Sequence, residues 1–235
     1  MRIWVARPEP GAARTGERLA ALGHRPLLAP VLRVRPTGAA LPPGPYDGLI
    51  LTSANALDAA LAIADPGALR GIPIFAVGSR TAALAEARLG PVTVGTGDAA
   101  ALAALVRRRL APGARLIHLA GADRKPEPAS ALAVAGYALE THVAYAAEAV
   151  PHLPEAAFAA LAASPSGLDA ALHYSRRSAR VAHRLSEAAG HGGAFGALRH
   201  YCLSDDVAEA LDQAGVAVHF VAGRPREDDL LAGLS

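Results

Sequence analysis

The feature that most constrains the fold is an internal repeat, because the chain contains the same series of four segments twice. The counterparts follow one another in the same order: 2–32 with 115–145, 49–61 with 171–185, 74–90 with 200–215, and 92–106 with 218–234. In the first pair, each copy contains a predicted strand, an arginine-containing turn, a helix, a glycine and a second strand. Self-similarity over segments of this length indicates duplicated supersecondary structure, so we expect two units of similar build.

Short apolar runs alternate with Ala/Leu-rich helical segments along the chain. The predicted strands are Ile3–Ala6, Pro26–Ala29, Gly48–Leu51, Ile74–Val77, Val92–Val94, Leu116–Leu119, Ala138–His142, Ala171–Tyr174, Tyr201–Leu203 and Ala217–Val221. The predicted helices are Gly11–Leu22, Ala54–Ala62, Arg80–Leu89, Ala99–Arg109, Ser130–Ala135, Arg177–Ala188, Asp206–Gln213 and Arg226–Leu234. This alternation indicates right-handed crossovers and parallel sheets covered on both faces. So many strands favour an α/β protein with two sheets.

Two segments interrupt the alternation and are predicted connectors. Residues 31–45 are rich in Pro and Gly, and residues 141–154 begin as an extended alternation and end in prolines. Each follows the second strand of a repeat and is too long for a plain turn.

Composition narrows the class of protein. The chain has 235 residues, of which 52% are hydrophobic, yet no apolar run approaches the roughly 20 residues of a membrane span. The single cysteine, Cys202, and an N-terminus without a signal-peptide layout favour a reduced, cytoplasmic protein. A formal net charge of +2 is too small to indicate nucleic-acid binding. Lys125 is the only lysine, so arginine carries nearly all the positive charge; genome composition explains this bias, and an acidic ligand is the alternative.

Small polar residues and arginines follow six of the predicted strands. The turns are 6–8, 52–55, 77–81, 120–124, 174–178 and 203–206. Because ligands of open α/β sheets bind beyond the carboxyl ends of the strands, these residues either cap helices or hold a ligand. Arginine is present in four of the six turns, which favours a polyanionic ligand, and carboxylate and phosphate are not distinguished at this stage.

Several familiar motifs are absent. No Gly-x-Gly-x-x-Gly follows a strand, no phosphate-binding Gly-Lys-Ser/Thr loop is present, and no Gly-x-Ser-x-Gly elbow occurs. The histidines lack metal-ligand spacing, so His118 and His173 are predicted to pack in the interior or lie at the surface. A Rossmann nucleotide enzyme is therefore disfavoured. A non-catalytic two-domain binding protein for a small polyanionic ligand stays an alternative to an enzyme.

The ordered set of repeat, "LTSANAL", "AVGSRTAALAEARLG" and "VAGRPREDDLLAGL" resembles the uroporphyrinogen-III synthase family over essentially the whole chain. The resemblance implies two doubly wound, flavodoxin-like domains joined by a two-stranded antiparallel β-ladder. One domain would comprise residues 1–33 and 150–235 and the other residues 38–140, with linkers at about 34–37 and 141–149. The active site would lie in the interdomain cleft.

The resemblance also implies a reaction. The family cyclises hydroxymethylbilane to uroporphyrinogen III in tetrapyrrole biosynthesis, with inversion of ring D and loss of water. It uses no metal and no organic cofactor. The substrate is a linear tetrapyrrole with eight carboxylates. We expect no nucleic-acid or membrane partner, and we expect a monomer because the sequence shows no spare apolar helix stripe.

Site residues are carried over from the same resemblance. Tyr145 matches the tyrosine for which the family resemblance implies a proposed role as proton donor, with simple packing in the ladder as the alternative. The predicted substrate-binding residues are Arg7, Arg14, Thr52, Ser53, Asn55, Gly78, Ser79, Thr81, Arg124, Ser175 and Ser204. The acidic pair Asp205 and Asp206 departs from the family pattern, and we expect Asp206 to form a capping box with Glu209.

Overall fold

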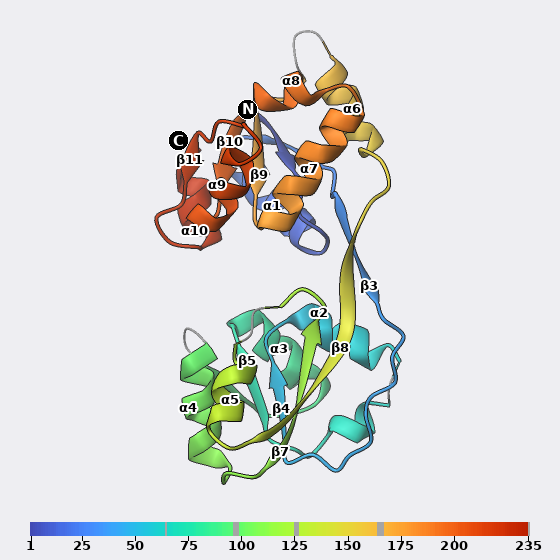
Figure 1. The fold of residues 1–235 in the computed structure, drawn as a ribbon, viewed down its shortest axis with the longest axis vertical. Helices are drawn as coiled ribbons and strands as arrows, with labels where there is room; N and C mark the ends of the chain where they lie inside the picture. The colour runs from blue at the N-terminus through green and yellow to red at the C-terminus, as the bar shows by residue number, and fades with distance from the viewer. Residues whose placement is uncertain (64, 96–98, 125–126, 164–166, 235) are drawn as a thin grey trace. The chain divides into compact units, whose positions relative to one another are not determined.

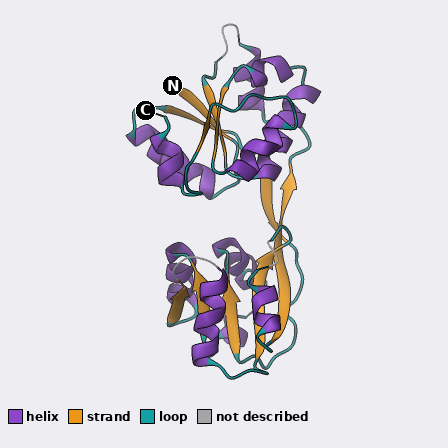
Figure 2. Cartoon of the chain, turned by 60° about the vertical axis from the view of Figure 1, so that its left-hand side comes forward, coloured by secondary structure: helices purple, strands orange, loops and turns teal. Residues whose placement is uncertain are grey.

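The computed structural model of the chain describes residues 1–63, 65–95, 99–124, 127–163 and 167–234. The chain divides into two compact units. Unit 1 consists of Met1–Arg33 and Glu148–Ser235, and unit 2 is the continuous segment Val34–Ala147. Each unit contains one sheet with helices on its faces (Figures 1 and 2).

Unit 1 is built on a five-stranded sheet of order β11-β10-β9-β1-β2, in which the strand pairs are parallel. Its strands are β1 Arg2–Val5, β2 Arg25–Leu28, β9 Ala170–His173, β10 Arg199–Cys202 and β11 Phe220–Val221. Its helices are α1 Gly11–Ala21, α6 Glu155–Ala162, α7 Arg176–Ala188, α8 Gly192–Gly196, α9 Asp205–Asp212 and α10 Glu227–Ala232. The central strands are fully apolar or nearly so, as expected for parallel strands that are buried on both faces.

Unit 2 is built on a six-stranded sheet of order β3-β8-β7-β4-β5-β6. Its strands are β3 Leu32–Pro36, β4 Gly48–Leu51, β5 Ile74–Val77, β6 Val92–Gly95, β7 Arg115–Gly121 and β8 Ala138–Ala149. Its helices are α2 Ala54–Leu61, a 3₁₀ turn at Pro66–Leu69, α3 Ser79–Arg88, α4 Ala99–Arg109 and α5 Ala129–Val134.

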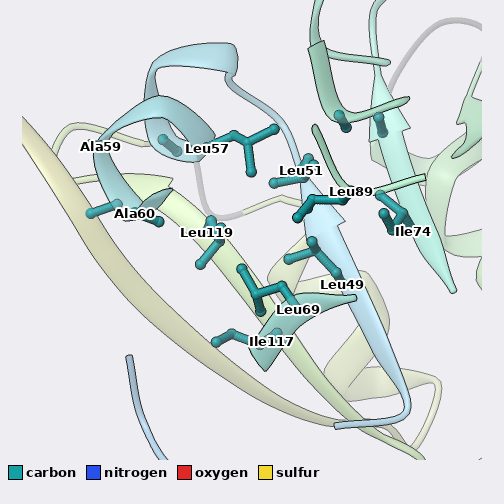
Figure 3. Close-up of a cluster of buried hydrophobic side chains, with 14 of the residues drawn as sticks. Leu49, Leu51, Leu57, Ala59, Ala60, Leu69, Ile74, Leu89, Ile117 and Leu119 are labelled. Carbon is teal, nitrogen blue, oxygen red and sulfur yellow. The ribbon is translucent and has the colours of Figure 1, made fainter. Parts of the chain in front are cut away.

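Two hydrophobic clusters cover the two faces of the unit 2 sheet. On one face, Leu57 of α2 packs with Leu49, Leu51 and Leu119 (Figure 3). On the other face, residues of α4 and α5 pack against Ile50 and neighbouring strand residues. The carboxyl ends of the strands are therefore held at one edge of a well-packed sheet.

The strands β3 and β8 form an antiparallel ladder. The amide of Val150 donates to the carbonyl of Val31 at 3.0 Å, and the amide of Thr37 donates to the carbonyl of Ala144 at 2.9 Å. As the residue number rises along β3 it falls along β8, which defines the antiparallel direction. The segments 31–45 and 141–154, which the sequence marks as connectors, contain these two strands.

The strand orders explain the internal repeat. The order β2-β1-β9-β10-β11 of unit 1 corresponds to β8-β7-β4-β5-β6 of unit 2, which is also the pairing of repeated segments in the sequence. Both follow the doubly wound, flavodoxin-like pattern 2-1-3-4-5. The predicted fold is confirmed.

The structure differs from the prediction in several elements. The prediction ends a strand at His142, whereas β8 runs on to Ala149. Helices α6 and α8 were not predicted. The expected capping box at Asp206 is wrong, because Ser204 is the N-cap of α9 and Asp206 lies inside the helix.

Candidate functional site

In unit 2, small polar groups lie where the parallel strands end. Thr52 and Ser53 follow β4, and Gly78 and Ser79 follow β5. Ser53 is the N-cap of α2 and Gly78 the N-cap of α3, and neither makes a side-chain capping bond. Helix N-termini present unpaired N–H groups and the positive end of the helix dipole, so this edge is suited to anions.

Tyr145 on β8 is brought to the same edge. Its phenol oxygen lies 3.2 Å from Oγ of Ser53, a hydrogen bond in which either group can be the donor. The two residues are 92 positions apart, and the bond exists because β8, β7 and β4 are neighbours in the sheet. The structure thus joins the predicted proton donor to a predicted substrate-binding residue.

A β-bulge and a glycine make room for this phenol. The β7–β8 register pairs Ala120 with Val143 but Gly121 with Tyr145, so one residue of β8 is skipped. A bulge re-aims the side chain beyond it, which here is Tyr145. A Cβ atom on Gly121 would lie 2.7 Å from Cζ and 2.9 Å from the hydroxyl of Tyr145, so no larger residue fits without displacing the ring.

Thr52 has a buried partner beneath it. Its Oγ1 lies 3.0 Å from Nε2 of His118 on β7, whose side chain is buried while Thr52 is exposed. Burial, and secondarily the positive charge of Arg124, lowers the pKa of His118 to about 4. The imidazole is therefore neutral near pH 7, and Arg124 lies near enough to act on it.

The other predicted residues of unit 2 differ in exposure. Arg124 is exposed and donates weakly, at 3.5 Å, to the carbonyl of Gly121. Ser79 is exposed and Asn55 is half-buried in the first turn of α2. Gly78 adopts a φ of +84°, which side chains rarely tolerate. Thr81 is buried and offers little surface to a ligand.

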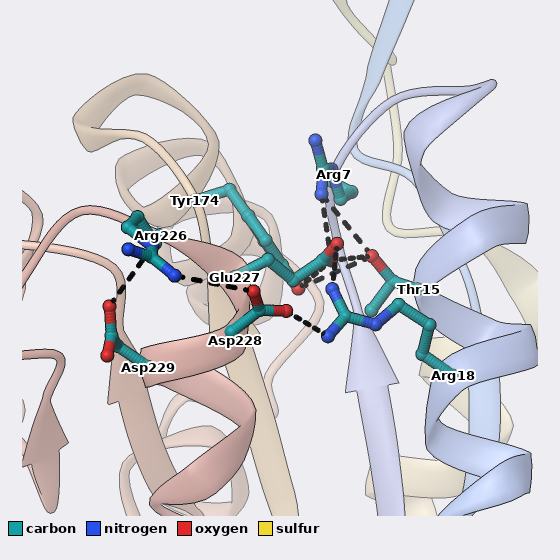
Figure 4. A network of polar contacts seen from close by, with 8 residues as sticks. All are labelled: Arg7, Thr15, Arg18, Tyr174, Arg226, Glu227, Asp228 and Asp229. Carbon is teal, nitrogen blue, oxygen red and sulfur yellow. Dashed lines mark hydrogen bonds and ion pairs between the residues drawn. The ribbon is translucent and has the colours of Figure 1, made fainter. Parts of the chain in front are cut away.

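In unit 1, the equivalent edge holds a closed polar network around Glu227 of α10 (Figure 4). One carboxylate oxygen accepts from Arg7 at 3.1 Å, Thr15 at 2.6 Å and Tyr174 at 2.6 Å. The other accepts from Arg18 at 2.9 Å. The Arg7 guanidinium also lies 3.9 Å from the centre of the Tyr174 ring. Arg7, which was predicted to bind the substrate, therefore already binds a carboxylate of the chain itself, that of Glu227.

The protonation states fit this network. Burial alone would raise the pKa of Glu227, but hydrogen bonds from Thr15 and Tyr174 and the charge of Arg7 lower it overall. Burial, followed by the hydrogen bond to Glu227, raises the pKa of Tyr174. Glu227 is thus an anion and Tyr174 a neutral donor near pH 7.

The remaining predicted residues lie at other helix starts of unit 1. Ser175 caps α7 by accepting from the Ser178 amide at 3.2 Å. Ser204 is the N-cap of α9 and makes no side-chain capping bond. Arg14 projects half-exposed from α1.

The acidic residues after Ser204 are partly neutralised. Arg176, at the start of α7, donates to Asp206 at 2.7 Å and to Glu209 at 2.8 Å. The ion pairs replace the capping box expected from the sequence and reduce the repulsion that an anionic ligand would meet at this helix start.

Comparison with known proteins identifies the family. The model of the family "Uroporphyrinogen-III synthase HemD" matches residues 13–232. The chain belongs to the uroporphyrinogen-III synthase family. No curated protein matches the chain.

Solved structures agree with this assignment in fold. The uroporphyrinogen-III synthetase of Helicobacter pylori 26695 is 16% identical, with 99% of this chain and 97% of that chain covered and a TM-score of 0.67. A mutant uroporphyrinogen III synthase of the extremely thermophilic bacterium Thermus thermophilus is 20% identical, with 100% and 97% covered and a TM-score of 0.52. At such identities the likeness concerns the fold.

Three residues that contact the predicted site residues were not themselves predicted from the sequence as functional. His118 was assigned to packing or to the surface, Gly121 carried no motif, and Glu227 was one of several acidic residues in the last predicted helix. The sequence signal for Gly121 was its place in the strand-to-helix turn 120–124, which follows the predicted strand Leu116–Leu119.

Neither a metal centre nor a membrane segment is found in the described part of the chain. No group of three or more His, Cys, Asp or Glu side chains there is arranged to hold a metal ion. No helix among those residues has the length and apolar character needed to cross a membrane.

Proposed function

We propose that the protein is a uroporphyrinogen-III synthase that cyclises hydroxymethylbilane to uroporphyrinogen III, with inversion of ring D and loss of water. Family membership supports the tetrapyrrole substrate. The observation that carries the proposal is the Ser53–Tyr145 hydrogen bond at the start of α2. It places a phenol beside free helix N–H groups, where an anionic substrate would be held.

In the proposed reaction, the substrate hydroxyl accepts a proton and leaves as water, taking the C–O bonding electrons. The resulting azafulvenium cation is attacked by the substituted carbon of ring D, and the spiro intermediate then fragments and recloses. Because the cation is reactive by itself, the protein contributes chiefly by orienting the bilane. Its second contribution is one proton donor.

Tyr145 is assigned as that donor. When Ser53 donates to the phenol oxygen, the phenol proton is free to go to the leaving hydroxyl. The positive end of α2 at Ser53 stabilises the negative charge that develops on the phenol. Gly121 keeps the space in which the ring takes this position.

Binding of the eight carboxylates is assigned first to unit 2. The groups are Thr52, Ser53, Asn55, Gly78, Ser79, Thr81 and Arg124, of which Thr81 acts through its backbone amide. Unit 1 would add Arg14, Ser204 and the backbone amides of the Ser175 turn, while Arg7 contributes only if it exchanges Glu227 for the substrate. Cofactor-free action, a cytoplasmic location and a monomeric state belong to the same proposal.

The test is the product isomer. The purified protein is incubated with hydroxymethylbilane, the products are oxidised, and the type I and type III uroporphyrins are separated. We expect type III at a rate proportional to protein concentration. Product that is entirely type I contradicts the proposal, and tight substrate binding without turnover favours the alternative, a non-catalytic polyanion-binding protein.

A further inference from the structure

His118 has one hydrogen-bond partner and one nitrogen without any. Its Nε2 lies 3.0 Å from Thr52 Oγ1. Its Nδ1 is buried and has no hydrogen-bond partner among the residues that the structure describes. Since the ring is neutral near pH 7, one of the two nitrogens carries a proton and the other a lone pair.

The surroundings select which nitrogen is protonated. A proton on Nδ1 would leave a buried N–H without an acceptor, which is rare in folded proteins. A proton on Nε2 leaves only an unpaired acceptor at Nδ1, which is tolerated more often. Nε2 therefore donates to Thr52.

The direction of this bond determines what Thr52 can do. A hydroxyl has one proton to donate and two lone pairs to accept. With a lone pair used by His118, the Thr52 proton stays available, and the exposed side chain presents it outward at the carboxyl end of β4. A carboxylate only accepts hydrogen bonds, so the hydroxyl is set to bind one.

We propose that His118 is a positioning residue that fixes the Thr52 hydroxyl as a donor to one carboxylate of the substrate. The identity of the substrate rests on the proposed function. The duplicated unit offers a comparison, because Val5 of β1 stands where β7 has His118: the registers pair Ile50 with His118 and Leu172 with Val5. A buried apolar residue thus suffices for the scaffold at this position.

Steady-state kinetics test the proposal. His118→Leu raises the KM for hydroxymethylbilane about tenfold, the effect of one hydrogen bond to a charged group, while kcat and the type III fraction stay unchanged. His118→Gln, whose amide N–H reaches the position of Nε2, restores the KM. Thr52→Val raises the KM as much as His118→Leu, and the double variant raises it no further. The matched control is His142→Leu, at another buried histidine of unit 2, which leaves the KM unchanged.

Two outcomes of these kinetics overturn the proposal. The first is a double variant whose KM increase equals the combined effects of His118→Leu and Thr52→Val, because the effects of two residues that act through one bond do not add. The other is a loss of kcat with unchanged KM in His118→Leu.

A second measurement needs no variant and no turnover. Nitrogen NMR of the ligand-free protein identifies the tautomer of His118, and we expect the proton on Nε2. A proton on Nδ1 overturns the proposal even where a variant fails to fold. If hydroxymethylbilane is not converted, the proposed function fails separately. The affinity for uroporphyrin III, an octacarboxylate, then decides: a loss of about tenfold in His118→Leu supports the positioning role, and unchanged affinity contradicts it.

Discussion

The turn after β4 in unit 2 and the turn after β9 in unit 1 occupy the same place in the duplicated fold, yet their side chains have different partners. Ser53 and Ser175 are equivalent N-caps. Ser175 caps its own helix through the Ser178 amide, whereas Ser53 makes no capping bond and contacts the phenol of Tyr145.

The neighbouring positions show the same contrast. Tyr174 in unit 1 donates to Glu227, and Arg7 at the end of the adjacent strand binds the same carboxylate. At the position equivalent to Tyr174, unit 2 has the exposed Thr52, and the bonds of Arg124 to described residues are weak ones to nearby carbonyls. One scaffold thus supports two arrangements of its strand ends: in unit 1 they hold a carboxylate of the chain, and in unit 2 we propose that they bind a ligand.

The largest expected effect comes from the two tyrosines. Tyr145→Phe lowers kcat about 100-fold, the lower range for loss of a proton donor, because the bound bilane ionises readily by itself. Tyr174→Phe keeps kcat but loses a hydrogen bond to a charged group, which costs about 2 kcal/mol of stability. Stability of unit 1 is read from the fluorescence of Trp4, the only tryptophan, which is buried there. Equal kcat losses in the two variants would remove the contrast.

The next largest effect is expected from Glu227, the carboxylate at the centre of the unit 1 network. Glu227→Gln lowers the unfolding free energy of the Trp4 transition by about 2 kcal/mol, because a part-buried ionic network loses its central charge. The pKa of Glu227 is lowered in the folded state, so this stability is present above the ordinary carboxyl pKa. The gap between wild type and variant should close as the pH falls through the lowered pKa. Glu209→Gln, at a more exposed pair, is the control and should cost little. A gap that widens in acid contradicts the assigned ionisation.

Gly121→Ala tests the space around Tyr145. The new methyl group would meet the Tyr145 ring, so we expect the phenol to move and kcat to fall about tenfold, with a destabilisation of about 1 kcal/mol. Gly95→Ala on β6 is the matched control, since its Cβ would have only ordinary contacts beginning at 3.5 Å. Unchanged kcat in Gly121→Ala would show that the placement of the phenol is unimportant.

The two serines should give the smallest effects, and of opposite kind. Ser175→Ala removes a capping bond and costs about 1 kcal/mol in the Trp4 transition. Ser53→Ala costs less stability, because no capping bond is lost and water can replace Ser53 at the half-buried phenol of Tyr145, and it lowers kcat only about threefold. Product assays and denaturant unfolding check both. If Ser53→Ala lost as much stability as Ser175→Ala and kept full activity, Ser53 would be a helix cap and not a partner of the catalytic phenol.

Much of the fold follows from local sequence. Apolar runs such as Gly48–Leu51 and the ordered repeat predict two parallel sheets, because the periodicity of each element is strong. Helix α6 was missed since its Ala-rich sequence carries almost no polar face, and α8 since three of its five residues are glycine. The ladder came from the family resemblance and not from periodicity.

The candidate site was less predictable, because its contacts join distant parts of the chain. Ser53 and Tyr145 were both predicted as site residues. Their contact, however, depends on the strand order and on a β-bulge, and no local sequence pattern predicts either. The pairing of Arg7 with Glu227 spans 220 positions and was not foreseen. The sequence identified the turns, and the structure shows which of their side chains already bind partners within the chain.

We propose that the strand ends of unit 2 bind the ligand while those of unit 1 keep Glu227. Amide hydrogen exchange with and without uroporphyrin III tests it most directly, since the free amides at a helix start are protected when an anion binds. We predict slower exchange in residues 52–57 and 119–124 and unchanged exchange in residues 227–232. Faster exchange in residues 227–232, with no protection in unit 2, would show that the ligand displaces Glu227 and would contradict the account.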